Sequence, residues 1–371
     1  MNKNRGTTTE SAYVPENHMV PPTMAFFTIT AMLIGIGVLG FQRYIARDAG
    51  YDGWISILVG GLIMHILLWM IYQILQESGG DIVSVHTYVA GKYLGNFLNI
   101  IFSLYFLFIC VVILRTYIEV IQVWIFPRLN VWVFTFIFML LIHYLVSGGF
   151  RIVVGVCMFS VILGLPLLLL DFFPIQLARV ENLFPVINHS VPEILKGTKT
   201  ATLSFLGIEL LFVYYPFLKN PQSSKKWAHF GMFYTTLFYM GTAIVAFIYY
   251  SEEQLRHVIW ATISLWKIVE FPFVERFEYV GIAMWVYVMI PNVCITLWAA
   301  TRIIKRVFQF KQRKVLWFYF ILVYIATCLI KDRETIDQLN NLTGKVGLYV
   351  LLYIPVLFLL LKIVTKVRNR R

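Results

Sequence analysis

The chain has 371 residues, of which 59% are hydrophobic and only 13% are charged, and its formal net charge is +12. A soluble protein of this length needs more charge to cover its surface, so the composition predicts a membrane protein. The basic residues lie at the ends of apolar runs and not along one soluble face, which excludes nucleic-acid binding as the reason for the charge.

Taken in chain order, the apolar runs predict an all-α polytopic membrane protein with about ten transmembrane helices. Runs of about 18 or more mostly apolar residues are long enough to cross a bilayer as helices. Residues 1–19 are expected to form a polar tail, residues 20–362 one membrane domain and residues 363–371 a basic tail. The expected spans are Val20–Gly40, Trp54–Leu75, Phe97–Gln122, Val131–Val146, Ile152–Asp171, Thr200–Phe217, Phe230–Tyr250, Gly281–Thr301, Val315–Ile330 and Val346–Leu361.

The first span contains Gly35, Gly37 and Gly40 within six residues. Each glycine lowers helix stability by about 1 kcal/mol relative to alanine, so the cluster favours a local break, although small residues also serve close helix packing. A break exposes backbone N–H and C=O groups, which are tolerated only beside protein, water or a ligand. The start of the outer half-helix can hold an anionic ligand group. The ligand-binding candidates here are Gly35, Ile36, Gly37 and Leu39.

The third span carries two opposite charges, Arg115 and Glu119, in its outer half. Because they are four residues apart, they share one helix face. We expect a structural ion pair, with a gate or a contact to a ligand carboxylate as the alternative.

The sixth span repeats the small-residue interruption of the first, in the run Ser204–Glu209. A ten-helix chain interrupted in its first and sixth spans predicts two five-helix repeats that meet at a central small-molecule site. Glu209 is the deepest carboxyl group in the chain, and a carboxylate at mid-membrane marks a functional site by default. It either recognises a ligand amine, acts in gating, or serves as a structural carboxyl bonded to neighbouring backbone. The candidates here are Ser204, Phe205, Gly207 and Glu209.

The distribution of charge predicts the orientation. Lysine and arginine are densest in the sixth loop, the eighth loop and the C-terminal tail, so both termini should be cytoplasmic. The long seventh loop contains the apolar patch Val258–Val269, which is too short to span the bilayer. We expect this patch to lie as an interfacial helix with Trp260 and Trp266 at headgroup depth.

The sequence gives no sign of catalysis. It contains no nucleophile motif or Walker loop, and Gly35-Ile36-Gly37 lacks the third glycine of a dinucleotide fingerprint. The four cysteines lie inside apolar runs without metal-ligand spacing. We therefore expect no enzyme activity, no cofactor and no metal site.

Several motifs together resemble one known family. They are Asp52-Gly53-Trp54-Ile55, the run Ser204–Glu209 followed by Pro216, Thr262-Ile263-Ser264-Leu265, and the run from Phe273 to Glu278. With the glycine-rich first span, they resemble the spore germination receptor B subunits, which belong to the amino acid–polyamine–organocation transporter superfamily. The chain departs from the family at Gln42, where proline is expected.

The resemblance implies a five-plus-five inverted-repeat fold with a site between the first, third, sixth and eighth spans. It also implies a nutrient-sensing subunit of the spore inner membrane, with an amino acid as the expected ligand and receptor A and C subunits as partners. Two alternatives stay open. One is a secondary amino acid transporter, with or without proton coupling through Glu209, and the other is a scaffolding subunit with a vestigial site.

Overall fold

The structure is a computed structural model that describes residues 14–269, 272 and 275–369. Within these residues, seven helical segments are long and apolar enough to cross a membrane, and three shorter apolar helices fall in the expected first, fourth and sixth spans. All ten expected spans are therefore helical, and the chain is an all-α, multi-pass membrane protein. The helices of the unbroken spans are α3 (Gly53–Ser78), α4 (Ile82–Trp124), α5 (Val131–Ser147), α6 (Phe150–Leu168), α10 (Pro221–Tyr249), α13 (Phe277–Phe308), α14 (Gln312–Leu329) and α15 (Arg333–Arg368).

The first and sixth spans are both broken near their middle. In the first span, α1 (Met24–Leu33) is separated from α2 (Phe41–Ala49) by a non-helical step at Gly35 and a short 3-10 helix, Ile36–Leu39. In the sixth, α8 (Val191–Leu203) is followed by turn residues and a 3-10 turn before α9 (Leu211–Tyr214). The sequence prediction of two interruptions is confirmed.

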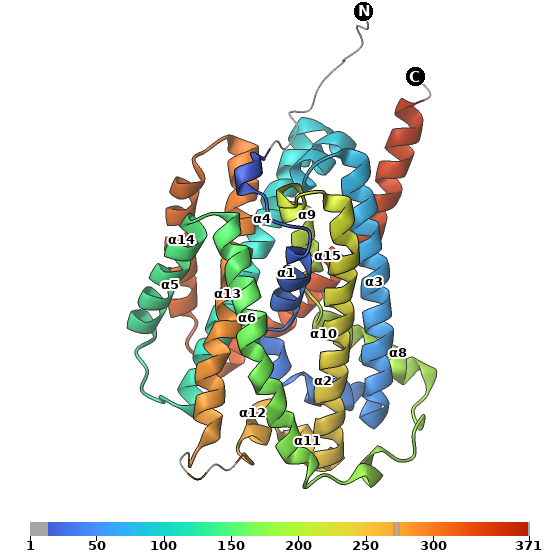
Figure 1. The fold of residues 1–371 in the computed structure, drawn as a ribbon, viewed down its shortest axis with the longest axis vertical. Coiled ribbons are helices and arrows are strands. Elements are labelled where there is room, and N and C mark those ends of the chain that lie inside the picture. The colour runs from blue at the N-terminus through green and yellow to red at the C-terminus, as the bar shows by residue number, and fades with distance from the viewer. Residues whose placement is uncertain (1–13, 270–271, 273–274, 370–371) are drawn as a thin grey trace, which may run out of the picture.

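The two broken spans run in opposite directions and are joined at both ends. At one end, the N–H of Val20 donates to the carbonyl of Phe217, and the N–H of Lys219 donates to the carbonyl of Val20, each at 2.8 Å. At the other end, the hydroxyl of Thr200 donates to Asp48 at 2.6 Å. This antiparallel crossing relates the first five spans to the second five as an inverted repeat (Figure 1).

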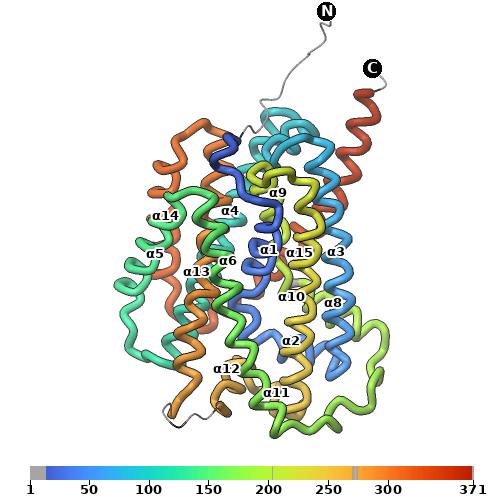
Figure 2. Tube along the Cα trace, in the orientation of Figure 1, coloured from blue at the N-terminus to red at the C-terminus, as the bar shows by residue number. Residues whose placement is uncertain are grey.

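The remaining helices form a bundle around this crossing. Helix α1 packs against α6, α10 and α13, and α13 packs along α4 (Figures 1 and 2). Helices α5 and α14 form a pair at one side, while α8 lies against α3 at the other. Two short helices of the seventh loop, α11 (Glu252–His257) and α12 (Ala261–Trp266), close the end opposite to α9.

Among the helices that begin earlier than the apolar runs indicated, α4 and α15 differ most. Helix α4 starts at Ile82 and bends at Gly91, whose φ of 77° allows the turn. Helix α15 starts at Arg333, not at Val346, because Asp332 caps it by accepting the N–H of Thr335 at 2.7 Å. These hydrogen bonds from Thr335 also hold the pKa of Asp332 below its usual range. The extra turns mix polar and apolar residues, among them the exposed Lys92 and Glu334, so they do not form continuous apolar runs.

The structure describes the two expected tails only in part. Residues 1–13 and 370–371 lie outside the described residues, while helix α15 continues through Arg368, inside the tail expected from residue 363. Phe273 and Val274 of the family motif also lie outside the described residues.

The expected interfacial helix is wrong in both length and place. Only Ala261–Trp266 is helical, and Trp266 is 2% exposed because its ring packs against Gly281 and Trp285. The patch is apolar because it is folded into the protein and not because it lies on lipid.

Candidate ligand-binding site

A cavity of about 340 Å³ lies beside the break of the first span. Its wall comes from both broken spans, from α4, from α15 and from the segment that precedes α12. Most of its volume therefore lies between the breaks and the end of the bundle that α11 and α12 close. The lining residues used below are Gly35, Ile36, Gly37, Gly40, Ile109, Val112, Ile113, Thr116, Thr200, Ser204, Tyr239, Trp260, Asn292, Arg333, Asp337, Asn340 and Asn341.

Four of the predicted ligand-binding residues belong to this wall: Gly35, Ile36, Gly37 and Ser204. The other four do not line the cavity but lie at or beside the two breaks: Leu39, Phe205, Gly207 and Glu209. Leu39 and Phe205 are fully buried, and the Phe205 ring packs edge-on against Tyr239.

Gly207 brings the two breaks into contact. Its φ is 130°, a conformation that favours glycine, and a Cβ at this position would lie 2.4 Å from the side chain of Met32. Glycine is therefore required here for two independent reasons, the backbone conformation and the close approach of α1.

Two side chains from other helices satisfy the carbonyl groups that the first break exposes. A helix end leaves its last four carbonyls without partners, which lipid cannot supply. The amide of Asn292 on α13 donates to Ala31 at 2.8 Å and to Ile34 at 3.4 Å. The hydroxyl of Tyr239 on α10 donates to Leu33 at 2.9 Å. The break is thus held open by α10 and α13.

Glu209 plays the corresponding part in the sixth span. Its carboxylate accepts the N–H of Gly207 at 2.8 Å and the hydroxyl of Tyr105 at 2.7 Å, and the side chain is fully buried. It therefore sits at the start of the 3-10 turn Ile208–Leu210, where a negative charge meets free N–H groups. This geometry corresponds to the structural role that the sequence left open for it.

The polar wall contributed by α15 was missed in the sequence. Arg333, Asp337, Asn340 and Asn341 recur at helical spacing, so they share one face that is turned to the cavity. The signal was present as a polar stripe directly before an apolar run. The expected span starts at Val346 because only there does the run become continuously apolar.

The expected ion pair between Arg115 and Glu119 is replaced by two other interactions. Within the described chain, their charged groups form no ion pair with each other. Arg115 donates to the carbonyls of Ile330 at 2.7 Å and Lys331 at 3.2 Å, at the end of α14. Glu119 pairs with Arg333 at the start of α15. The turn between α14 and α15 brings in acceptors and a guanidinium that compete with the pair predicted from spacing.

A hydrogen-bonded chain ties the seventh loop to the first span. The amide of Gln42 donates to the hydroxyl of Thr262 on α12, which donates to the carbonyl of Val38, each at 2.8 Å. Trp260 lines the cavity from the same loop, and a Cβ at Gly40 would lie 2.4 Å from the carbonyl of Ile259. Gln42, where the family was expected to have proline, thus helps to hold this loop over the cavity.

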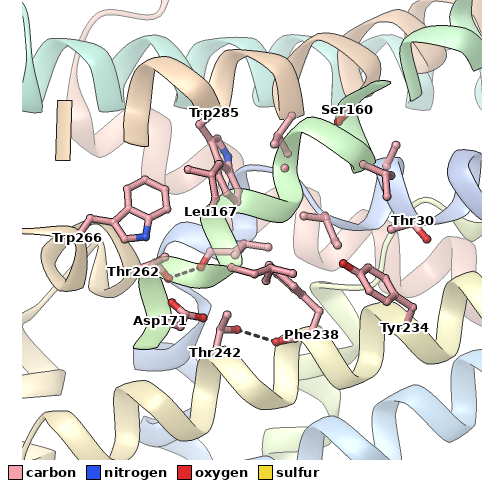
Figure 3. Close-up of a pocket in the computed structure, with 17 residues that line it drawn as sticks. Thr30, Ser160, Leu167, Asp171, Tyr234, Phe238, Thr242, Thr262, Trp266 and Trp285 are labelled. Atoms are coloured by element: carbon pink, nitrogen blue, oxygen red, sulfur yellow. Dashed lines mark hydrogen bonds between the residues drawn. The ribbon is translucent and has the colours of Figure 1, made fainter. Parts of the chain in front are cut away.

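A second, smaller cavity of about 40 Å³ lies on the other side of α1, among α6, α10, α12 and α13. Figure 3 shows Asp171, Thr242 and Thr262 at one end of it and Thr30 and Tyr234 at the other. The hydroxyl of Thr30 and the indole N–H of Trp285, both in this wall, have no hydrogen-bond partner among the described residues. The volume and these polar atoms suit bound water.

The fold and the site together define a class: a transporter-like membrane protein with a ligand-sized cavity at two broken helices. A solved structure of a Na⁺-coupled sialic acid symporter, in a substrate-bound outward-open state, has the same fold. It aligns with a TM-score of 0.62 over 91% of this chain and 79% of that one, at 13% sequence identity.

The family follows from the sequence comparisons. Residues 19–336 match the spore germination protein family of spore permeases, and the chain belongs to this family. The Bacillus cereus spore germination protein GerQB is 40% identical over 357 residues, which span 96% of this chain and 99% of that protein. Spore germination proteins B2 and YndE of Bacillus subtilis (strain 168) are 30% and 26% identical, over 70% and 95% of this chain and 72% and 99% of their own lengths. The family is receptor- and permease-like.

Proposed function

We propose that this chain is the nutrient-sensing B subunit of a spore germinant receptor, and that it binds an amino acid in the cavity of about 340 Å³. The observation that carries the proposal is the position of this cavity, whose wall includes both breaks. Its relatives are named as spore germination proteins, which supports receptor A and C subunits as its partners. The proposed location is the spore inner membrane, with both termini cytoplasmic.

The chemistry of the wall supports an amino acid as the ligand. Backbone around Gly35 and Gly37, at the start of the outer half-helix, offers N–H groups to a carboxylate. The face of α15 offers the amides of Asn340 and Asn341 to an amine, together with the carboxylate of Asp337, which also pairs with Arg333 at 3.1 Å. Between them, Ile109, Val112 and Ile113 of α4 provide an apolar surface for a side chain.

Sensing requires that the ligand bind one conformation better than another. The cavity wall contains parts of separate helical elements: the two halves of the first span, the sixth span and α15. A ligand that contacts all of them favours one relative arrangement, and the proposed partner subunits respond to that arrangement.

The substitution Gly37→Leu tests the site. A Cβ at Gly37 would meet only the hydroxyl of Tyr239, at 3.8 Å, so leucine enters the cavity without forcing the backbone apart. We expect normal protein abundance and loss of the germination response to nutrient. Gly241→Leu is the matched control, because a Cβ there meets nothing within 4 Å and Gly241 lies outside the cavity. Normal response in a Gly37→Leu strain with normal abundance would exclude this cavity as the nutrient site.

A secondary amino acid transporter is the second candidate, and the fold shared with a symporter favours it. Purified protein in liposomes separates the two functions. Binding of a radiolabelled amino acid without its accumulation supports the sensor, whereas saturable accumulation supports the transporter.

A further inference from the structure

The carbonyl groups around Asn292 form an unusual cluster. The amide nitrogen of Asn292 lies 2.8 Å from the carbonyl oxygen of Ala31, 3.4 Å from that of Ile34 and 2.8 Å from that of Val288. The first two belong to the broken end of α1 and the third to α13, one turn before Asn292 itself. Three backbone oxygens from two helices therefore converge on one nitrogen atom of a residue that is only 2% exposed.

Such a cluster of oxygens is the arrangement that binds a small hard cation. In transporters built on broken helices, unwound backbone carbonyls and the C-terminal ends of half-helices coordinate sodium or a proton at mid-membrane. The C-terminal end of α1 also carries the negative end of its helix dipole, which attracts positive charge. Here the position in front of these oxygens is filled by the chain's own amide, whose N–H groups carry partial positive charge.

We propose that the amide of Asn292 takes the place of a monovalent cation between α1 and α13. The break in the first span is then held by a neutral side chain instead of an ion. Stability of the fold and the response to nutrient are consequently independent of sodium, although the fold is that of a sodium-coupled symporter.

The same residue connects this cluster to the ligand cavity. Asn292 belongs to the cavity wall, and a Cβ at Gly35 would lie 2.6 Å from its side-chain oxygen. Its nitrogen thus holds the end of α1 while its oxygen lies against the glycine step that follows. A side chain in this position transmits changes at the break to α13 without any ion entering or leaving.

The first test compares thermal unfolding of the purified wild-type protein in sodium chloride and in choline chloride at equal ionic strength. We expect the same melting temperature in both salts across a titration from low to high sodium. A melting temperature that rises with sodium concentration would overturn the proposal, because it would reveal a cation site that stabilises the folded state.

The second test uses Asn292→Asp, which keeps the size of the side chain but replaces the donor nitrogen by a carboxylate oxygen. This oxygen would face the carbonyls of Ala31, Ile34 and Val288 without a hydrogen atom between them. We expect a lower melting temperature in choline and a rise with added sodium, since a cation would now bridge the oxygens. Asn99→Asp is the matched control: Asn99 is also a fully buried asparagine, but it bonds to His86 far from the break. Any change in its stability should be the same in both salts.

A folded Asn292→Asp protein with no sodium effect would overturn the proposal. If this variant folds in sodium but not in choline, the proposal is supported. If it folds in neither salt, Asn292→Ser is measured instead, because its short hydroxyl leaves room for an ion. A melting temperature of Asn292→Ser that rises with sodium supports the proposal. A melting temperature that does not depend on sodium overturns it. These measurements need no nutrient. They can therefore contradict the role of Asn292 while the proposed sensing function holds, and the sensing function can be contradicted while the role of Asn292 holds.

Discussion

A single buried carboxylate shows how partners decide the role of a residue. Glu209 lies at mid-span, where the sequence left open ligand binding, gating and a structural role. Its two acceptor oxygens are already used by Gly207 and Tyr105, and it is not part of the cavity wall. The geometry therefore supports a role in shaping the sixth span.

The structural role of Glu209 predicts a defect in stability. Glu209→Ala removes two buried hydrogen bonds, each worth about 0.5–1.5 kcal/mol. We expect a lower melting temperature and lower abundance in the membrane, while the receptors that remain respond at an unchanged nutrient concentration. Glu77→Ala, on the exposed face of α3, is the control and should change neither quantity. If abundance is normal but the nutrient concentration for half-maximal response rises, Glu209 acts on the ligand instead.

The partners of Glu119 give a second prediction at this scale. A double-mutant cycle of Glu119→Ala with Arg333→Ala should show a coupling energy of about 1–3 kcal/mol, because the two side chains form an ion pair. The cycle of Glu119→Ala with Arg115→Ala should give less than about 0.5 kcal/mol, since Arg115 binds the end of α14 instead. Thermal unfolding of purified variants measures both. A larger coupling for the second cycle would restore the pair expected from their spacing.

At the scale of elements, α12 is held over the cavity by the Gln42–Thr262–Val38 chain of hydrogen bonds. Because Ile259 and Trp260, directly before α12, line the proposed ligand-binding cavity, weakening this contact should weaken ligand retention. Thr262→Val keeps the shape of the side chain and removes the hydroxyl, at a cost of about 1 kcal/mol. We expect the nutrient concentration for half-maximal response to rise about 5-fold.

A matched control for Thr262→Val is Thr235→Val. Thr235 is equally buried, but its hydroxyl donates to Gly231 within α10 and ties no loop to the first span. Its dose–response curve should be that of the wild type. An unchanged curve for Thr262→Val as well would show that α12 does not influence ligand binding.

The elements also show what the sequence could predict. Both breaks could be predicted because their cause is local: Gly35 and Gly207 weaken a helix in any surroundings. The spans could be located from the length of the apolar runs. The start of α15 could not be found from hydropathy, since Asp337 and Asn340 are polar residues beside a cavity that only the folded bundle creates. The partner of Glu119 was equally hidden, because Arg333 lies 214 residues away in sequence.

At the scale of the whole molecule, charge divides the two ends of the bundle. Lys226 lies in the first two turns of α10, at the end of the bundle where α9 lies, whereas Glu253 lies in α11 at the opposite end (Figure 1). The excess of basic residues near Lys226 predicts that this end is cytoplasmic. The four native cysteines are buried and free, so single introduced cysteines can report the orientation.

We expect a membrane-impermeant maleimide to label Glu253→Cys in intact cells that express the protein. Lys226→Cys should be labelled only after the membrane is permeabilised, because both side chains are exposed but lie at opposite ends. Labelling of Lys226→Cys in intact cells would invert the proposed topology.

The position of the α15 wall has a consequence for how members of this family diverge. The segment that matches the family ends at residue 336, and Asp337, Asn340 and Asn341 follow directly after it. The family match therefore ends just before part of the surface that is proposed to hold the ligand amine. Substitutions in these few helical turns can alter which nutrient a receptor prefers while leaving the segment that matches the family unchanged. We expect that exchanging only residues 337–344 between two relatives transfers the nutrient preference of one to the other.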